Sequence, residues 1–183
     1  MVIVRAGATV RIEGRATDRV VATSDDRWGL KVARRRGTIE VQIGRSGEVL
    51  VPAGSSVKVY AGHSVELRDI GGSAAVYAGG HAFLRGVDTL VYAASGGALE
   101  IACERVAGND VQCLAGRDLR CFIRQLADAR LMVNDLGGYW EGRIGAGHVK
   151  LRLKAGGDVT LVTDEDVIAQ PPQYVLGRIE RPQ

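Results

Sequence analysis

The residues best suited to chemistry are few and lie far apart in this sequence. Two histidines, His63 and His81, follow similar Tyr-Ala-Gly segments at an offset of eighteen residues, so a regular repeat would stack them at adjacent corners. Two such imidazoles, with Asp69 or Asp88 nearby, could bind a metal ion at the surface. The simpler interpretation is a polar corner copied by the repeat, and we therefore predict no metal site.

The remaining reactive side chains form no catalytic pattern. The cysteines are odd in number and lack Cys-x-x-Cys spacing, which predicts small, half-buried strand residues in a reducing compartment and neither disulfides nor a zinc site. Asp25, Asp26 and Glu104 could imitate the carboxylates of a carbohydrate-active β-helix enzyme, but such catalysis needs two carboxylates on one face. We predict no catalytic residues, no enzyme activity and no cofactor, and keep a carbohydrate-active enzyme as an alternative. The three cysteines are Cys103, Cys113 and Cys121.

Charge is unevenly distributed along the chain. The net charge is only +3, but residues 1–45 contain ten basic and five acidic residues. Arg34, Arg35, Arg36 and Arg45 are candidates for a basic edge that binds an acidic polymer: a polysaccharide, a nucleic acid or an anionic membrane surface. No aromatic residues alternate with these arginines, which disfavours a surface that stacks bases. The alternative is a solvated edge kept soluble by its arginines.

Composition indicates one folded unit of ordinary size. The chain has 183 residues, of which 46% are apolar, 5% are aromatic and 25 are glycines. This apolar content and low net charge are not those of a disordered chain. No apolar run approaches the ~18 residues of a membrane-spanning helix, and the first residues lack a secretory pattern. We therefore expect a cytoplasmic protein with no transmembrane segment.

Short apolar groups with a period of two recur along the chain. They include residues 39–43, 57–59, 119–123 and 149–153, and this alternation places apolar side chains on one face of a β-strand. Glycines separate most groups and are expected to supply the φ > 0 conformations of tight corners. Residues 117–133 could also form a helical stripe, but the same alternation favours strands there. The sequence predicts an all-β fold.

The spacing of these groups favours a single-domain β-solenoid. Residues 57–63 are echoed by residues 75–81, and a unit this short must stack on its neighbours to bury its apolar face. We predict roughly eight to nine short coils over residues 1–166, with a β-sandwich or jelly roll as the alternative fold. Residues 167–183 contain two adjacent prolines and are predicted to form an extended tail that caps its own chain or docks on a partner.

Three segments resemble a β-strand-repeat family of bacterial adhesin-like proteins of unknown function: Ala8–Gly14, Val49–Val57 and Gly147–Leu161. That family is similar in architecture to the bactofilins, which are cytoskeletal β-helices that polymerise end to end. The resemblance covers most of residues 8–162 and implies a right-handed β-solenoid without a defined catalytic site. The arginines at 34–36 and the proline-containing tail have no counterpart in it.

We predict a structural or scaffolding protein that forms homo-oligomers or filaments, or that docks another protein through the ends of the solenoid. The end of a solenoid is a row of unpaired backbone groups, and we expect the first strand of the chain at one such end. Asp164–Asp166 near the other end would favour head-to-tail contacts with the basic N-terminal region. The predicted partner-binding residues are Val2, Val4, Arg34, Arg35, Arg36, Tyr174, Val175 and Ile179.

Overall fold

The computed structural model of the chain describes residues 1–27, 29–164, 168–169 and 178–180. Within these ranges the protein is all-β and contains no helix. The strands are β1 (Val2–Ala6), β2 (Val10–Arg15), β3 (Val21–Ser24), β4 (Leu30–Arg35), β5 (Thr38–Ile43), β6 (Gly47–Pro52), β7 (Val57–Ala61), β8 (Val65–Ala78), β9 (Ala82–Ser95), β10 (Leu99–Val106), β11 (Asp110–Ala115), β12 (Leu119–Gln125), β13 (Ala129–Asp135), β14 (Gly138–Arg143), β15 (Val149–Ala155), β16 (Val159–Thr163), β17 (Ile168–Ala169) and β18 (Arg178–Glu180). The prediction of strands over residues 117–133 is confirmed by β12 and β13.

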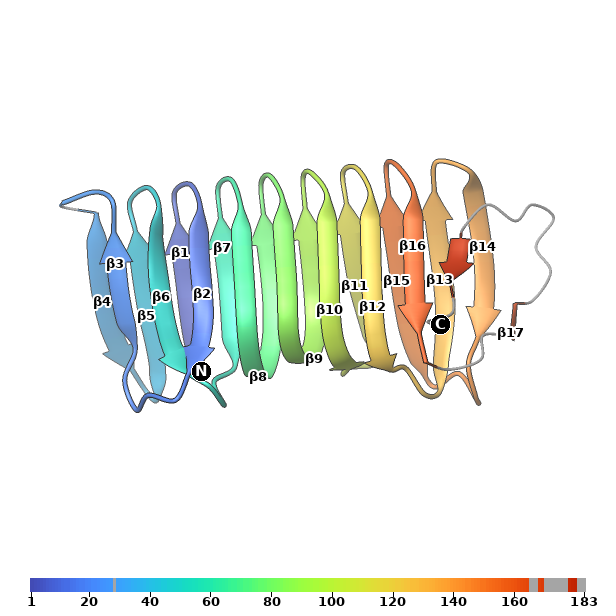
Figure 1. Cartoon of the computed structure of the whole chain (residues 1–183), viewed down its shortest axis with the longest axis horizontal. Coiled ribbons are helices and arrows are strands. Elements are labelled where there is room, and N and C mark those ends of the chain that lie inside the picture. Colours follow the sequence, from blue (N-terminus) through green and yellow to red (C-terminus); the bar gives the residue numbers. More distant parts are fainter. Residues whose placement is uncertain (28, 165–167, 170–177, 181–183) are drawn as a thin grey trace.

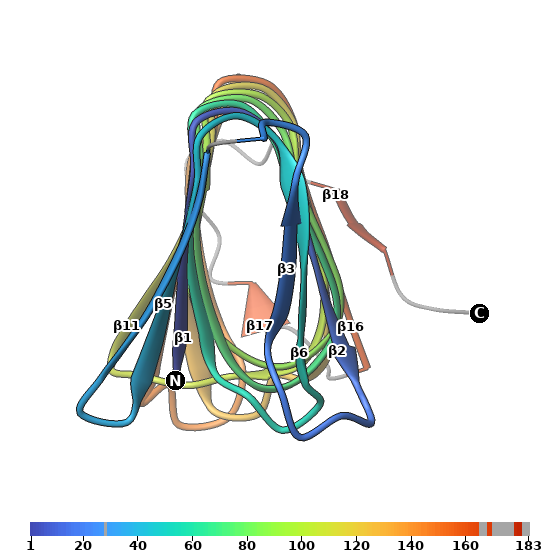
Figure 2. The same cartoon turned by 90° about the vertical axis from the view of Figure 1, so that its left-hand side faces the viewer.

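The strands form two walls that face each other across a shared core (Figures 1 and 2). The front wall joins, in spatial order, β3, β6, β2, residues 65–70 of β8, residues 82–87 of β9, β10, β12 and β16. The back wall joins β4, β5, β1, β7, residues 74–78 of β8, residues 90–95 of β9, β11, β15, β13 and β14. Because β8 and β9 each run through both walls, all strands belong to a single sheet.

The spatial order of the strands differs from their order in the chain. After β2 the chain runs out to β3 and β4, which pair antiparallel with β6 and β5, and then returns through β5 and β6. Strand β1 therefore lies between β5 and β7, and β2 lies between β6 and β8. The expectation that the first strand forms an open end is wrong. Val2 and Val4 are 3% and 0% exposed, so neither can bind a partner.

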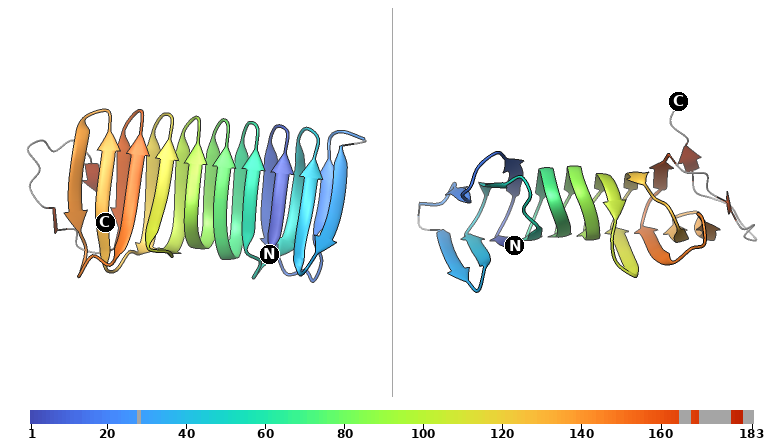
Figure 3. Two further views of the ribbon diagram at one scale, coloured as in Figure 1. Left: turned by 180° about the vertical axis from the view of Figure 1, so that it is seen from behind. Right: turned by 90° about the horizontal axis from the view of Figure 1, so that it is seen from below.

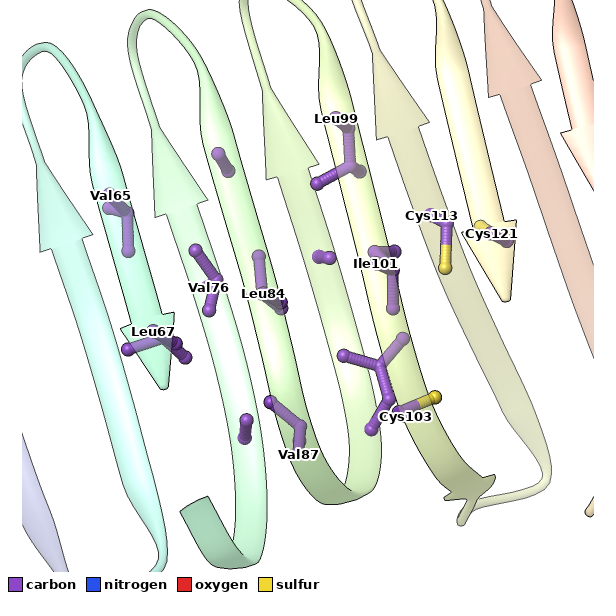
Figure 4. Packing of buried hydrophobic residues seen from close by; sticks show 14 of the residues in the cluster. Val65, Leu67, Val76, Leu84, Val87, Leu99, Ile101, Cys103, Cys113 and Cys121 are labelled. Atoms are coloured by element: carbon purple, nitrogen blue, oxygen red, sulfur yellow. The ribbon is translucent and has the colours of Figure 1, made fainter. Parts of the chain in front are cut away.

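Apolar side chains from both walls fill the space between them. Val4, Val59 and Val76 lie in register on the back wall, and Leu67 and Leu84 lie in register on the front wall. Each of the five is fully buried, and Figure 4 shows how the side chains of neighbouring strands pack along the core. The gap is filled by aliphatic side chains, which explains why so few aromatic residues are needed.

A column of glycines lines the tight corners where the back wall turns into the front wall. An added Cβ atom at Gly62, Gly79 or Gly96 would lie less than 3.0 Å from the carbonyl oxygen of the preceding glycine in the column. None of these three has a positive φ angle. The expectation that corner glycines supply φ > 0 is therefore wrong here, because they are needed for the close approach of stacked backbones. The column contains, in spatial order, Gly44, Gly7, Gly62, Gly79, Gly96, Gly116 and Gly156.

Candidate interaction site

Strand β4 forms one end of the back wall and has a free edge. Among the described residues it pairs only with β5, and all six of its residues are exposed. Figure 2 views the molecule from this end. Unpaired backbone N–H and C=O groups on such a strand can accept a further strand. The end is therefore a candidate site for association.

The inner face of β4 exposes the last apolar layer of the core. Leu30 and Val32 pair in register with Ile43 and Val41, whose side chains point into the core. Leu30 is 38% exposed and Val32 is 57% exposed, whereas Val41 is fully buried. Covering this face with a second protein surface would remove apolar area from water at roughly 25 cal/mol per Å².

The predicted arginine cluster lies at the far end of the same strand. Arg34 and Arg35 end β4, and Arg36 forms the turn to β5 together with Gly37. The φ angles of Arg36 and Gly37 are 46° and 80°. They match the two-residue hairpin turn in which both central residues have left-handed backbone conformations. None of the three arginines has an ion pair within the described part of the chain.

The C-terminal segment returns to its own chain where it is described. The backbone of β17 pairs with β14, and that of β18 pairs with β16 in register Leu161–Ile179. Ile179 thus lies in a ladder of its own chain, next to the front wall. Tyr174 and Val175, which were also predicted to bind a partner, lie outside the described residues.

The histidines predicted to stack occupy different positions of the repeat. Val65 pairs with Ala82, so His81 lies beside Ser64, and His63 lies one position earlier. Paired residues of these two segments, such as Tyr60 and Tyr77, are 17 positions apart in the sequence. His63 and His81 are 18 positions apart, so they do not align. The side-chain Nδ1 atom of His81 accepts a hydrogen bond from the backbone of Ala98 (3.1 Å).

No group of three or more potential metal ligands converges within the ranges that the structure describes. The carboxylates suggested for an alternative enzyme are also far apart. Glu104 lies on β10 and pairs with Arg124 at 3.0 Å, whereas Asp25 and Asp26 follow β3. Five strand spacings along the front wall separate β3 from β10, which is about 24 Å.

The three cysteines are buried in one region of the core. Cys113 and Cys121 face each other from opposite walls, with Cys103 close by (Figure 4). Burial raises the pKa of Cys103 to about 12. The pKa of Cys121 is also raised, first by a hydrogen bond with Cys113 and then by burial. The thiolate is the reactive form, so these thiols are unreactive in the folded protein, and they are more deeply buried than the half-buried positions that the sequence predicts.

Cysteine alkylation is expected to report unfolding. At pH 8 the folded protein should react with iodoacetamide at least about 100-fold more slowly than the denatured chain, because the buried thiols stay protonated and covered. Below pH 9.0 both states keep the Cys103 proton, but between pH 9.0 and about 12 only the unfolded state loses it. The free energy of unfolding should therefore fall over that range. Rapid alkylation of the folded protein at pH 8 would contradict this assignment.

Ion pairs neutralise most of the cations on the front wall. Arg11 bonds to Glu66 at 2.8 Å and to Glu48 at 3.3 Å, and Arg85 bonds to Glu100 at 3.0 Å. Exposed pairs of this kind contribute little stability. Their effect is to leave this wall with little unbalanced charge. Further pairs on or beside this wall are Arg15–Glu13, Arg68–Glu66, Arg105–Asp88 and Arg124–Glu104.

The back wall carries a stack of tyrosines that sequence reasoning missed. The rings of Tyr60 and Tyr77 lie 4.9 Å apart and those of Tyr77 and Tyr92 lie 4.6 Å apart, measured between centroids. The guanidinium of Arg5 lies 4.5 Å from the centroid of Tyr60, and the ammonium of Lys58 lies 5.4 Å from it. The signal in the sequence is the repeated Tyr-Ala-Gly segment, which also indicates a corner.

A groove of about 850 Å³ runs along the outside of the back wall beside this stack, and we call it the tyrosine groove. It extends from β4 to β9, and the glycine column leaves one side of it without side chains. Figure 3 shows the back wall from outside. Its polar and charged lining comes from Arg5, Lys31, Gln42, Tyr60, Tyr77 and Ser95.

Asp128 and His148 make a contact that the sequence did not suggest. Asp128 has a φ of 63°, and its carboxylate bonds to the Nδ1 atom of His148. This hydrogen bond holds the pKa of Asp128 below its usual value. His148 ends the loop before β15, whereas Asp128 lies directly before β13, and His148 is largely exposed. We assign the pair the structural task of holding that loop against β13.

Among the described residues, no helix is long and apolar enough to cross a membrane. The comparisons with family models, with curated proteins and with solved structures found no match to this chain.

Proposed function

We propose that this protein is a right-handed β-solenoid with a structural role, related to the adhesin-like repeat family and the bactofilins, and that it self-associates through β4. In-register parallel pairing of successive coils supports the solenoid architecture. The observation that carries the function is the free edge of β4 together with the exposed apolar side chains of Leu30 and Val32 on its inner face. The occupant we propose is a second copy of the chain.

A two-fold axis through Val32 would pair two β4 strands antiparallel and extend the back wall. In that register Val32 contacts its own counterpart, Leu30 faces Arg34, and Lys31 faces Ala33. No two cations are directly opposite each other, which such pairing requires. A contact of this type uses the same surface on both copies and closes as a dimer.

The opposite end of the back wall is less suited to pairing. There β14 already has β13 on one side, and residues 142–143 pair with β17 on the other. Part of this edge is therefore satisfied by the chain itself. This favours a closed dimer through β4 over the head-to-tail filament expected from the charges of residues 164–166.

Sedimentation velocity over a range of concentrations tests the proposal. We expect a monomer that converts to a dimer as concentration rises, both with the full chain and with a chain that ends at residue 166. A monomer at every concentration would overturn the proposal. An open series of larger species, or loss of association on removing residues 167–183, would show instead that the C-terminal end carries the contact.

A further inference from the structure

The cations beside the tyrosine groove differ from those of the front wall because they lack carboxylate partners. Arg5 and Lys31 line the groove, and Lys58 lies beside Tyr60. None of the three forms an ion pair with any residue that the structure describes. The lining contains no acidic residue. Asp26 lies beside Gly29 and Gly44 at one end of the groove, and Glu40 lies on β5 in register with Ile3. The groove therefore has the charge to bind an anion.

The length of the groove indicates an extended ligand. It crosses the back wall from β4 to β9, which is five strand spacings or about 24 Å. Lys31 on β4 and Arg5 on β1 are separated by two strand spacings, about 10 Å. The amide of Gln42 on β5 lies between these two cations, and the hydroxyls of Tyr60 on β7 and Tyr77 on β8 lie beyond Arg5. All three side chains can form hydrogen bonds with a ligand. A chain with regularly spaced carboxylates and hydroxyls would match this arrangement.

Two other classes of anionic chain fit less well. An extended peptide gains most of its affinity by adding to a free strand edge, but β1, β7 and the second half of β8 are paired on both sides. Single-stranded nucleic acid needs free aromatic faces for its bases. Here Tyr77 is stacked on both sides, and Arg5 covers the ring of Tyr60.

We propose that the tyrosine groove binds an acidic polysaccharide of the uronate type. The carboxylates pair with Arg5 and Lys31, and the sugar hydroxyls bond to Gln42 and to the tyrosine hydroxyl groups. The glycine column allows the sugar chain to lie close to the backbone. The site and the proposed dimer contact share strand β4, but they use different faces of it: Lys31 points to the outer face of the back wall, whereas self-association uses the backbone edge and the inner-face side chain of Val32. The arginines at 34–36 do not line the groove.

Binding of polygalacturonate measured by calorimetry tests the proposal, with dextran, polyglutamate and single-stranded DNA as comparison polymers. We expect salt-dependent binding of polygalacturonate, weaker binding of polyglutamate and DNA, and none of dextran. Arg5→Gln should weaken polygalacturonate binding about tenfold, which is 1.4 kcal/mol. Tyr77→Phe should weaken it less, because it removes one hydroxyl and keeps the ring stack.

Arg120→Gln is the matched control, since Arg120 is an exposed arginine of the front wall and its loss should leave binding unchanged. Equal effects of Arg5→Gln and Arg120→Gln would overturn the proposal, as would equal or tighter binding of polyglutamate or DNA, or no binding of polygalacturonate at low salt. The same titration with a Val32→Lys chain separates this site from self-association: it should bind polygalacturonate as well as the unmodified chain.

Discussion

Replacing Gly79 with alanine is expected to lower the free energy of unfolding by about 3 kcal/mol or more. The added Cβ would lie less than 3.0 Å from the carbonyl oxygen of Gly62, which is backbone and cannot rotate away. This steric clash can be relieved only if the two stacked corners move apart. The backbone hydrogen bond from Gly79 to Ala61 (3.0 Å) lies at this corner, so separation would also weaken the adjoining ladder. Urea unfolding followed by circular dichroism measures the change.

Gly54→Ala is the matched control for this experiment. A Cβ atom at Gly54 would meet nothing within 4 Å, and the φ of Gly54 is not positive. Alanine there should be neutral or slightly stabilising, because it restricts only the unfolded chain. If Gly79→Ala unfolds at the same urea concentration as Gly54→Ala, the glycine column does not have the steric role assigned to it.

Replacing Val32 with lysine is expected to weaken self-association at least about 100-fold, or 2.7 kcal/mol. In the proposed dimer the two substituted side chains would meet across the symmetry axis, which places like charges directly opposite each other. The monomer should fold normally, since Val32 is 57% exposed. Sedimentation equilibrium gives the dissociation constant, and urea unfolding of the monomer shows whether the fold is kept.

Val21→Lys adds the same charge at the same end of the molecule and serves as the control. Val21 is 48% exposed and pairs with Leu50 on the front wall, away from the free edge of β4. The variant should retain association within a few-fold of the original chain. If both lysines disrupt association equally, general repulsion between basic ends explains the result, and pairing of β4 strands is not supported.

The local alternation of side chains determined much of this protein. Val57 and Val59, or Leu119 and Ile123, point to the same side of an extended chain whatever surrounds them, so the strands, their inward faces and the all-β class could be predicted. The strand placement of the three cysteines could be predicted in the same way, but they are buried where the sequence predicts half-buried positions. The poverty in aromatic residues could be related to a core filled by small aliphatic side chains.

The abundance of glycine was also visible in the sequence, but its reason was not. The sequence does not distinguish a glycine needed for φ > 0 from one needed for the close approach of two backbones. Only the position of the neighbouring carbonyl oxygen in the structure shows which role a glycine has. Likewise, the repeat around Tyr60 and Tyr77 was visible, but a one-residue difference in register decides that the tyrosines stack while His63 and His81 do not align.

Only the tertiary structure decided which strands are neighbours. Strands with the same alternation can pair with almost any other strand of the wall at similar local cost, so the sequence does not show that β1 lies between β5 and β7. That placement buries Val2 and Val4 and leaves β4 paired on one side only, within the part of the chain that the structure describes. The ends of the two walls depend on contacts between distant segments of the chain. So does the absence of ion pairs, among the described residues, for the cations beside the tyrosine groove. The period of two that determines each strand carries no information about these contacts.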